Sequence, residues 1–267
     1  MNNAFEEVLD DYFFSKSLRP ATEWSYRKVV RSFISFSGKG ISPEQVDKTL
    51  VLTWRRKIIH EEGLSRTTWN NKVTHMRAIF NHAIVNGLVT MRENPFNGVI
   101  TRPDVKRKKT LTDVQMNKIY LHMLAREEDE RTGMMELRKS ALRPAWFWLT
   151  VLDALRRTGM RQNQLLHIRL EDVNFEHRWI NLRPEGSKNH KEHRVPITEN
   201  LRPRLERLYN LSLERGAKMQ DQLFNLSRFD GRKNEISSNM DYPPLRAFFR
   251  RLSRECGFTV SPHRFRH

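Results

Sequence analysis

The sequence has 267 residues, and its 48 lysines and arginines against 31 aspartates and glutamates give a formal net charge of +17. So large an excess of positive charge is typical of proteins that bind polyanions. Hydrophobic residues make up 38% of the chain, which is enough for a core and excludes a wholly disordered basic tail. The single cysteine, Cys256, excludes an internal disulfide framework and a cysteine-rich zinc site.

The sequence also lacks the signals of a membrane or secreted protein. No stretch approaches the roughly 20 apolar residues that cross a bilayer, and the first residues have neither a basic region nor an apolar run. The histidines form no compact cluster with acidic residues, so no metal site is predicted. We therefore expect a cytoplasmic protein without metal or other cofactor and without a membrane partner, which acts on nucleic acid.

The first hundred residues predict four or more helices. A Ser-Pro-Glu-Gln sequence at 42–45 is typical of a capped helix start and predicts a helix to about residue 60. Ser65 can cap the next helix, in which apolar residues recur every three or four positions from Trp69 to Ile84. A further helix is predicted from about 23 to 36. This pattern indicates a helical domain over residues 1–101.

A short basic segment, 102–109, follows this helical part. Its cations are Arg102, Lys106, Arg107, Lys108 and Lys109. Pro95 and Pro103 interrupt regular structure around it, so we interpret the segment as a linker between two domains. Such a linker can follow phosphates across a groove. A solvated turn without a role is the alternative.

Residues 110–267 predict a second domain that combines helices with a little strand. Thr112 can cap a helix through Leu124, and an apolar helix is predicted from Pro144 to Gly159. The runs 178–183 and 193–197 flank a polar turn, which predicts a β-hairpin. Further helices are predicted over 199–214 and 244–255. The expected fold class is therefore mainly α with a small antiparallel β-sheet or hairpin, in two domains.

Four side chains of this second domain suggest a chemistry. Arg161 follows a glycine at the end of the apolar helix, and Lys188 lies at the hairpin tip. His263 and Arg266 are three apart, so both point to one face if Pro262 opens a helix. Two arginines can hold one phosphodiester and its transition-state charge without a metal, and a lysine or histidine can move the protons. The set predicts metal-free phosphoryl transfer.

In their order and separations these segments resemble the tyrosine recombinase (phage integrase) family over nearly the whole chain. The quoted motifs are Thr-Gly-Met-Arg161, Ser-Lys188-Asn-His-Lys-Glu-His-Arg-Val-Pro-Ile and Ser-Pro-His263-Arg-Phe-Arg266-His267. The resemblance implies a site-specific DNA recombinase with a SAM-like core-binding domain and an α+β catalytic domain. It implies that Arg161 and Arg266 bind the scissile phosphate, that Lys188 is the general acid and that His263 assists proton transfer.

The resemblance also implies a tyrosine nucleophile, which forms a 3′-phosphotyrosine link without ATP. It implies double-stranded recombination sites and further copies of the protein, normally four on two sites, as partners, with accessory DNA-bending proteins as a possibility. The nucleophile belongs a few turns after the His-x-x-Arg motif, whereas the sequence ends at His267. The tyrosines, all earlier, are Tyr12, Tyr26, Tyr120, Tyr209 and Tyr242. We expect a truncated catalytic domain that is inactive alone, with a natural remnant or a borrowed tyrosine as alternatives.

Other departures leave roles open. Gln164 stands where the family often has an acid, which is expected to change how Arg161 is supported. Lys191 competes with Lys188 for the role of acid, and His267 is either an active group or a packing residue. The duplex-contact candidates are Arg66, Lys72, Arg77, Lys106, Lys108 and Lys109. For each of them a merely solvated surface is the alternative.

Two other functions stay open on the sequence alone. The first is a DNA-binding module without a nucleophile, which occupies or regulates recombination sites. The second is a general basic nucleic-acid or ribosome-associated protein, whose binding depends on salt and not on paired half-sites.

Overall fold

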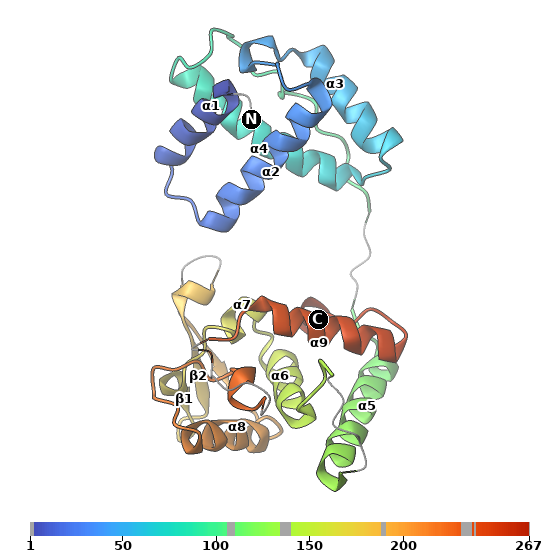
Figure 1. Ribbon diagram of the computed structural model, residues 1–267, viewed down its shortest axis with the longest axis vertical. Coiled ribbons are helices and arrows are strands. Elements are labelled where there is room, and N and C mark those ends of the chain that lie inside the picture. The colour runs from blue at the N-terminus through green and yellow to red at the C-terminus, as the bar shows by residue number, and fades with distance from the viewer. Residues whose placement is uncertain are drawn as a thin grey trace. The chain divides into compact units, whose positions relative to one another are not determined.

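The protein folds into two compact units, Met1–Arg107 and Lys108–His267, here called the N-terminal and the C-terminal unit (Figure 1). The structure is a computed structural model that describes residues 3–105, 110–133, 140–187, 191–230, 237 and 239–266. The side chains of Asn3 and Arg266 are not part of that description. Each unit has its own hydrophobic core.

The described part of the N-terminal unit contains the helices α1 (Asn3–Phe14), α2 (Pro20–Ser37), α3 (Lys48–Arg56) and α4 (Arg66–Val85). Aromatic rings fill the space among them. The Trp54 ring lies 5.0 Å from Phe33 and 5.4 Å from Trp69, and both contacts are edge-to-face. The predicted helical domain is thus confirmed as a helical unit, and Ser65 caps α4 as expected by accepting from the Thr68 N–H.

The helix predicted over residues 42–60 is wrong at its start. Pro43–Gln45 form only a 3₁₀ turn, in which the Ser42 N–H donates to the Gln45 side chain at 2.9 Å. The α-helix begins at Lys48 because Asp47 caps it, accepting from the Leu50 N–H at 2.7 Å. The same helical path then continues as a π-helical turn over Lys57–Glu61.

The C-terminal unit contains helices α5 to α9, short 3₁₀ turns and a small sheet. Its α-helices are α5 (Asp113–Thr132), α6 (Ala145–Thr158), α7 (Gln162–Leu165), α8 (Arg202–Glu214) and α9 (Tyr242–Cys256). Over the ranges described for both units, no helix has the length and apolar character needed to span a bilayer.

Helix α6 lies at the centre of the C-terminal unit, with α5, α8 and α9 around it (Figure 1). Its residues from Phe147 to Leu155 are all buried, and apart from Thr150 and Asp153 they are apolar. The Trp148 and Phe248 rings stack with centroids 4.2 Å apart and planes 5° apart, which joins α6 to α9. The chain segments that leave the two ends of α6 therefore start from fixed positions.

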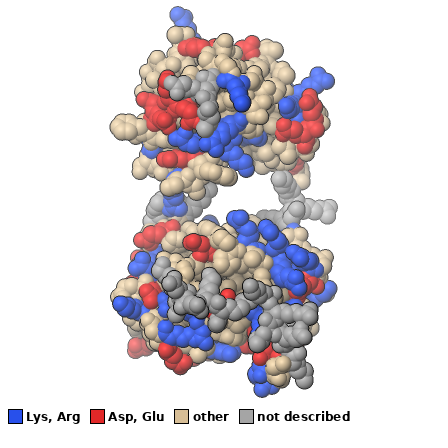
Figure 2. Space-filling view, in the orientation of Figure 1, with Lys and Arg blue, Asp and Glu red and all other residues tan. Residues whose placement is uncertain are grey.

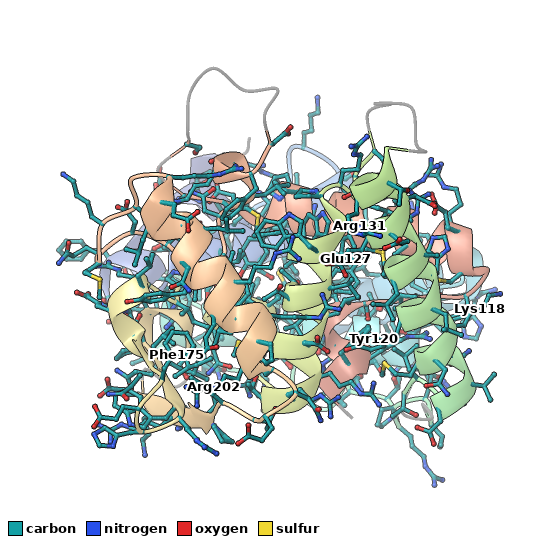
Figure 3. All side chains as sticks on the ribbon, turned by 90° about the horizontal axis from the view of Figure 1, so that it is seen from below. Lys118, Tyr120, Glu127, Arg131, Phe175 and Arg202 are labelled. Atoms are coloured by element: carbon teal, nitrogen blue, oxygen red, sulfur yellow. The ribbon has the colours of Figure 1, made fainter. Side chains whose placement is uncertain are left out.

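Polar contacts join α5 to its neighbours. Figure 3 labels Tyr120 and Glu127 on α5. The Tyr120 hydroxyl donates to the buried Asp153 of α6 at 2.7 Å, and Glu127 pairs with Arg204 and Arg207 of α8 at 3.3 and 3.0 Å. Helix α5 extends two turns beyond the predicted end at Leu124, because its polar second half consists of good helix formers and pairs with α8.

The predicted hairpin is confirmed. Strands β2 (Trp179–Leu182) and β3 (His193–Pro196) pair antiparallel, with Ile180 opposite Val195. A third strand, β1 (Val173–Asn174), pairs with β2 and was missed because two residues show no alternation. Asp172 turns the chain before β1 by accepting from the Arg169 N–H at 2.8 Å.

The stacked pair gives a test of the α6-centred core. We expect Phe248→Ala to lower the free energy of unfolding of the C-terminal unit by about 3–5 kcal/mol, because it leaves a cavity beside Trp148. Urea denaturation followed by tryptophan fluorescence measures this. The control Val114→Ala, at a position 79% exposed, changes it by less than about 0.5 kcal/mol. A loss below about 1 kcal/mol for Phe248→Ala would contradict the packing described.

Candidate phosphate-binding site

The turn after α6 presents Arg161 at the surface. Gly159 ends α6 in the left-handed region at φ 64°, and its N–H donates to the Leu155 carbonyl at 3.2 Å. The buried Gln164 side chain then accepts from the Arg161 N–H at 2.8 Å, which fixes the first turn of α7. Arg161 is exposed, so a fixed main chain carries a solvent-facing guanidinium. The neutral Gln164 thus supports the Arg161 turn through the backbone.

The 3₁₀ turn Pro184–Gly186, which follows β2 and is here called the hairpin base, packs directly against the Arg161 turn. A Cβ atom on Gly186 would lie 2.8 Å from the Cα of Gln164, closer than real Cβ contacts come. Only glycine allows the two main chains to approach so closely. Lys188, two residues further on, lies outside the described residues. Lys191 is described and exposed at the start of the returning segment.

The third segment is the 3₁₀ turn η6 (Pro262–Arg266), which packs against α6. Pro262 opens this segment, which forms a 3₁₀ turn in place of the helix considered in the sequence analysis. The buried Phe265 anchors it, with its ring 6.2 Å from that of Phe249 on α9. His263 is exposed on the same turn, whereas the side chain of Arg266 and all of His267 lie outside the description.

The structure therefore connects the described parts of these three segments through α6 and the turn that follows it. The Arg161 turn continues from α6, the hairpin base touches that turn at Gly186, and η6 packs on α6 itself. The elements α6 and η6 are in contact although more than a hundred residues separate them in sequence. This arrangement can present several cations and a histidine to one anionic group.

A cavity of about 280 Å³ adjoins the Arg161 turn. Its lining includes Asn163, His167, Arg169, Arg183 and Tyr242. The Arg183 guanidinium is paired with Asp172 at 2.7 Å and with Glu171, and the hydrogen bond to Asp172 raises its pKa. The Tyr242 hydroxyl donates to Asn163 Oδ1 at 2.5 Å, and burial raises the pKa of this phenol. The cavity wall is thus an ordered polar network.

The candidate duplex contacts of the N-terminal unit differ in their surroundings. Arg66 is exposed, and its N–H, at the start of α4, donates to Asp104 Oδ2 at 2.8 Å. Lys72 donates to the Ser32 hydroxyl at 2.8 Å and lies 5.4 Å from the Trp54 ring, and burial lowers its pKa. Arg77 is half-buried. Of these three side chains, Arg66 is the most accessible. Lys106, Lys108 and Lys109 lie outside the described residues.

Two exposed basic stripes were missed in the sequence analysis. On α2, Trp24, Lys28 and Arg31 share one face, with the Lys28 ammonium 5.2 Å from the Trp24 ring. On α9, the exposed Arg246, Arg250 and Arg254 follow one another at intervals of four residues, and Arg251, also exposed, pairs with Glu255. Figure 2 shows lysines and arginines gathered on the visible face of each unit. The spacing of three and four residues was the available signal.

Metal ligands are absent from this arrangement as far as it is described. Among the residues placed by the structure, no group of three or more histidine, cysteine, aspartate or glutamate side chains could hold a metal ion.

Comparison with known families identifies both units. The model of the phage integrase family matches residues 109–267, and that of the phage integrase SAM-like domain matches residues 2–102. A putative tyrosine recombinase XerC of Pseudomonas aeruginosa is 35% identical over 264 residues, and one of Pseudomonas syringae is 33% identical over 263 residues. Each alignment covers 98% of this chain, but only 60% and 54% of the respective relative.

Solved structures share the fold. The Tn1549 transposon integrase in complex with circular intermediate DNA matches with a TM-score of 0.67 at 16% identity, covering 99% of this chain and 84% of that one. The lambda integrase tetramer bound to a Holliday junction matches with a TM-score of 0.66 at 16% identity, covering 98% and 70%. At this level of identity the two likenesses show a common fold.

The close approach at Gly186 can be tested directly. We expect Gly186→Ala to lower the free energy of unfolding of the C-terminal unit by about 1–3 kcal/mol, because the added methyl group overpacks against the Gln164 main chain. Thermal and urea denaturation measure this loss. Gly40→Ala is the control, since a Cβ atom there meets nothing within 4 Å. Equal stability of the two variants would show that the hairpin base does not pack as described.

Proposed function

Because the chain belongs to the phage integrase family of tyrosine recombinases, we propose that its two units bind a DNA duplex and that the C-terminal unit cleaves and rejoins strands at specific sites. One observation supports this proposal most strongly. The Arg161 turn follows α6, Gly186 packs on that turn, and η6, which includes positions 263 and 266, packs on α6. We propose that the described site faces one scissile phosphate.

Each side chain has a proposed role in the reaction. Arg161 and Arg266 bind the non-bridging oxygens of the phosphodiester and stabilise the extra negative charge of the transition state. A tyrosine oxygen attacks phosphorus, a P–O bond to tyrosine forms, and the bond from phosphorus to the 5′ oxygen breaks. Lys188 gives its proton to the departing 5′ oxygen, and His263 assists in removing the tyrosine proton. The 3′-phosphotyrosine keeps the bond energy, so rejoining needs no ATP.

This chain spans 60% and 54% of the length of the two relatives, and the proposal refers to a protein that also provides the attacking tyrosine. We propose double-stranded recombination sites as the substrate and further copies of the protein as partners, in a tetramer on two sites. Accessory proteins that bend DNA, and a cytoplasmic location where DNA is accessible, belong to the same proposal.

Several basic surfaces support the proposed duplex binding. We assign phosphate contacts to Arg66, Lys72 and Arg77 of the N-terminal unit, to the 102–109 linker and to the arginine stripe of α9. Lys72 contributes least, because Ser32 and Trp54 already hold it. The positively charged surface and the +17 net charge together favour a polyanionic partner.

The role of Arg161 can be separated from general binding. We expect Arg161→Ala to abolish cleavage of a nicked suicide substrate by the full-length protein, because the transition-state charge loses its partner. Duplex affinity stays within about tenfold, since many other cations bind phosphate. The control Arg131→Ala removes an exposed arginine that is paired only locally with Glu128. Retained cleavage by Arg161→Ala would refute the assigned role.

Binding to paired half-sites without any cleavage by the wild-type protein would favour the alternative of a non-catalytic binding module.

The linker lysines provide a second test. Replacing Lys106, Lys108 and Lys109 together by alanine is expected to reduce the slope of log affinity against log salt by about 3, at roughly 0.9 per phosphate contact. Measurements of duplex affinity at salt concentrations from about 50 to 200 mM give this slope. The control, Lys16, Lys39 and Arg131 to alanine, removes the same charge from other exposed positions. Equal slopes for the two triple variants would exclude a linker-specific contact.

A further inference from the structure

The Asn163 side chain joins three separate segments of the C-terminal unit. Its amide nitrogen donates to the Gly186 carbonyl at 3.1 Å and lies 3.4 Å from the Glu185 carbonyl. Its amide oxygen accepts from the Tyr242 hydroxyl at 2.5 Å. Asn163 itself lies two residues after Arg161, in the first turn of α7. One side chain thus contacts the hairpin base and the first residue of α9.

The amide matches the hydrogen-bonding groups around it. The two hairpin carbonyls can only accept hydrogen bonds, so the group facing them must donate, whereas the group facing the Tyr242 hydroxyl accepts its proton. Asparagine offers both functions on one short side chain. An aspartate of the same shape would place a carboxylate oxygen against carbonyl oxygens, which repel it.

Two independent contacts strengthen the same junction. The buried Gln222 side chain donates to the Leu166 carbonyl at 2.6 Å and to the Met240 carbonyl at 3.0 Å, which joins the end of α7 to the chain entering α9. Gly186 has no Cβ, so its main chain lies directly on Gln164. The Arg161 turn, the hairpin base and the start of α9 therefore form one tightly connected body.

We propose that Asn163 is a positioning residue that fixes the base of the β2–β3 hairpin relative to the Arg161 turn, and so sets the alignment between the proton donor of the hairpin and the bound phosphate. The inference rests on the proposed function, which places the general acid two residues after Gly186. Tyr242 completes the junction by orienting the amide. Asn163 touches neither the phosphate nor the leaving group in this scheme.

The chemical consequence concerns one step of strand cleavage. As the bond from phosphorus to the 5′ oxygen breaks, that oxygen must receive a proton from the hairpin lysine. A misplacement of about 1 Å can cost on the order of 10²-fold in rate. A 5′ sulfur leaving group needs no proton. Loss of Asn163 is therefore expected to slow cleavage of the ordinary substrate and to leave cleavage of the 5′-thio substrate nearly unchanged.

The experiment compares full-length variants on matched nicked duplexes with a 5′-oxygen or a 5′-sulfur at the scissile phosphate. Asn163→Ala and Asn163→Asp are expected to cleave the oxygen substrate roughly 10- to 100-fold more slowly than wild type, and the sulfur substrate within about threefold of it. Tyr242→Phe keeps the ring and loses one hydrogen bond, so a smaller loss of about two- to fivefold is expected. Lys188→Ala, which removes the proposed acid itself, serves as the reference for full rescue.

Three outcomes would overturn the inference. Equal slowing on both substrates would place the defect at phosphate binding or in the fold. Wild-type rates on both substrates would show that the amide positions nothing. Rescue of Lys188→Ala without rescue of the Asn163 variants would separate Asn163 from the acid. Failure of Lys188→Ala to be rescued would instead refute the acid assigned under the proposed function.

A second measurement tests whether Asn163 stabilises the hairpin, and it does not depend on cleavage activity. Amide hydrogen exchange of the β3 segment, His193–Pro196, is expected to become faster in Asn163→Ala than in wild type, while exchange in α6 stays unchanged. Unchanged exchange in β3 would overturn the positioning role whatever the cleavage assays show. Faster exchange throughout the unit would do the same, because it would mean general destabilisation.

Discussion

The burial of the middle of α6, from Phe147 to Leu155, is the constraint on which the C-terminal unit depends. A helix segment that is largely apolar all round must be enclosed, and here α5, α8, α9 and η6 pack against it. Burial on all sides prevents the helix from rotating or sliding without breaking contacts such as the Trp148–Phe248 stack. Its C-terminal end is therefore a fixed point, and Arg161 leaves the core only three residues later.

Around that fixed point the site is assembled by main-chain contacts more than by pairs of charged side chains. Gln164 holds the Arg161 N–H, Asn163 holds the hairpin carbonyls, and Gly186 allows two backbones to touch. Neutral groups thus fix the main chain that carries the exposed Arg161. By contrast, Arg183 at the edge of the same cavity is neutralised by Asp172 and Glu171 and serves the fold.

Local signals made much of this structure predictable. Ser65, Thr112 and Gly159 act as the caps and stops that their residue types indicate, and the polar turn between two β-rich runs predicts the hairpin. The ordered arginine, lysine and histidine motifs indicated the family, which the matches to both units then showed. Such signals depend only on neighbours along the chain.

Contacts between distant residues could not be predicted in this way. Nothing near Lys72 in sequence reveals that Ser32 and Trp54 hold its ammonium group, so it looked as accessible as Arg66. The role of Asn163 depends on Gly186 and Tyr242, which lie 23 and 79 positions away. A three-residue turn over Pro43–Gln45 and an α-helix start look alike until Asp47 is seen to cap the helix.

The glutamine at position 164 has one more consequence. A carboxylate in its place would take up a proton in acid, at a pH near 4 for an unperturbed glutamate, and would then lose much of its strength as an acceptor. An amide does not titrate, so the Arg161 main chain keeps the same hydrogen bond in acidic and in alkaline solution. The conformation of this turn therefore does not depend on the protonation state of residue 164. Any change of activity or stability in acid originates at other groups.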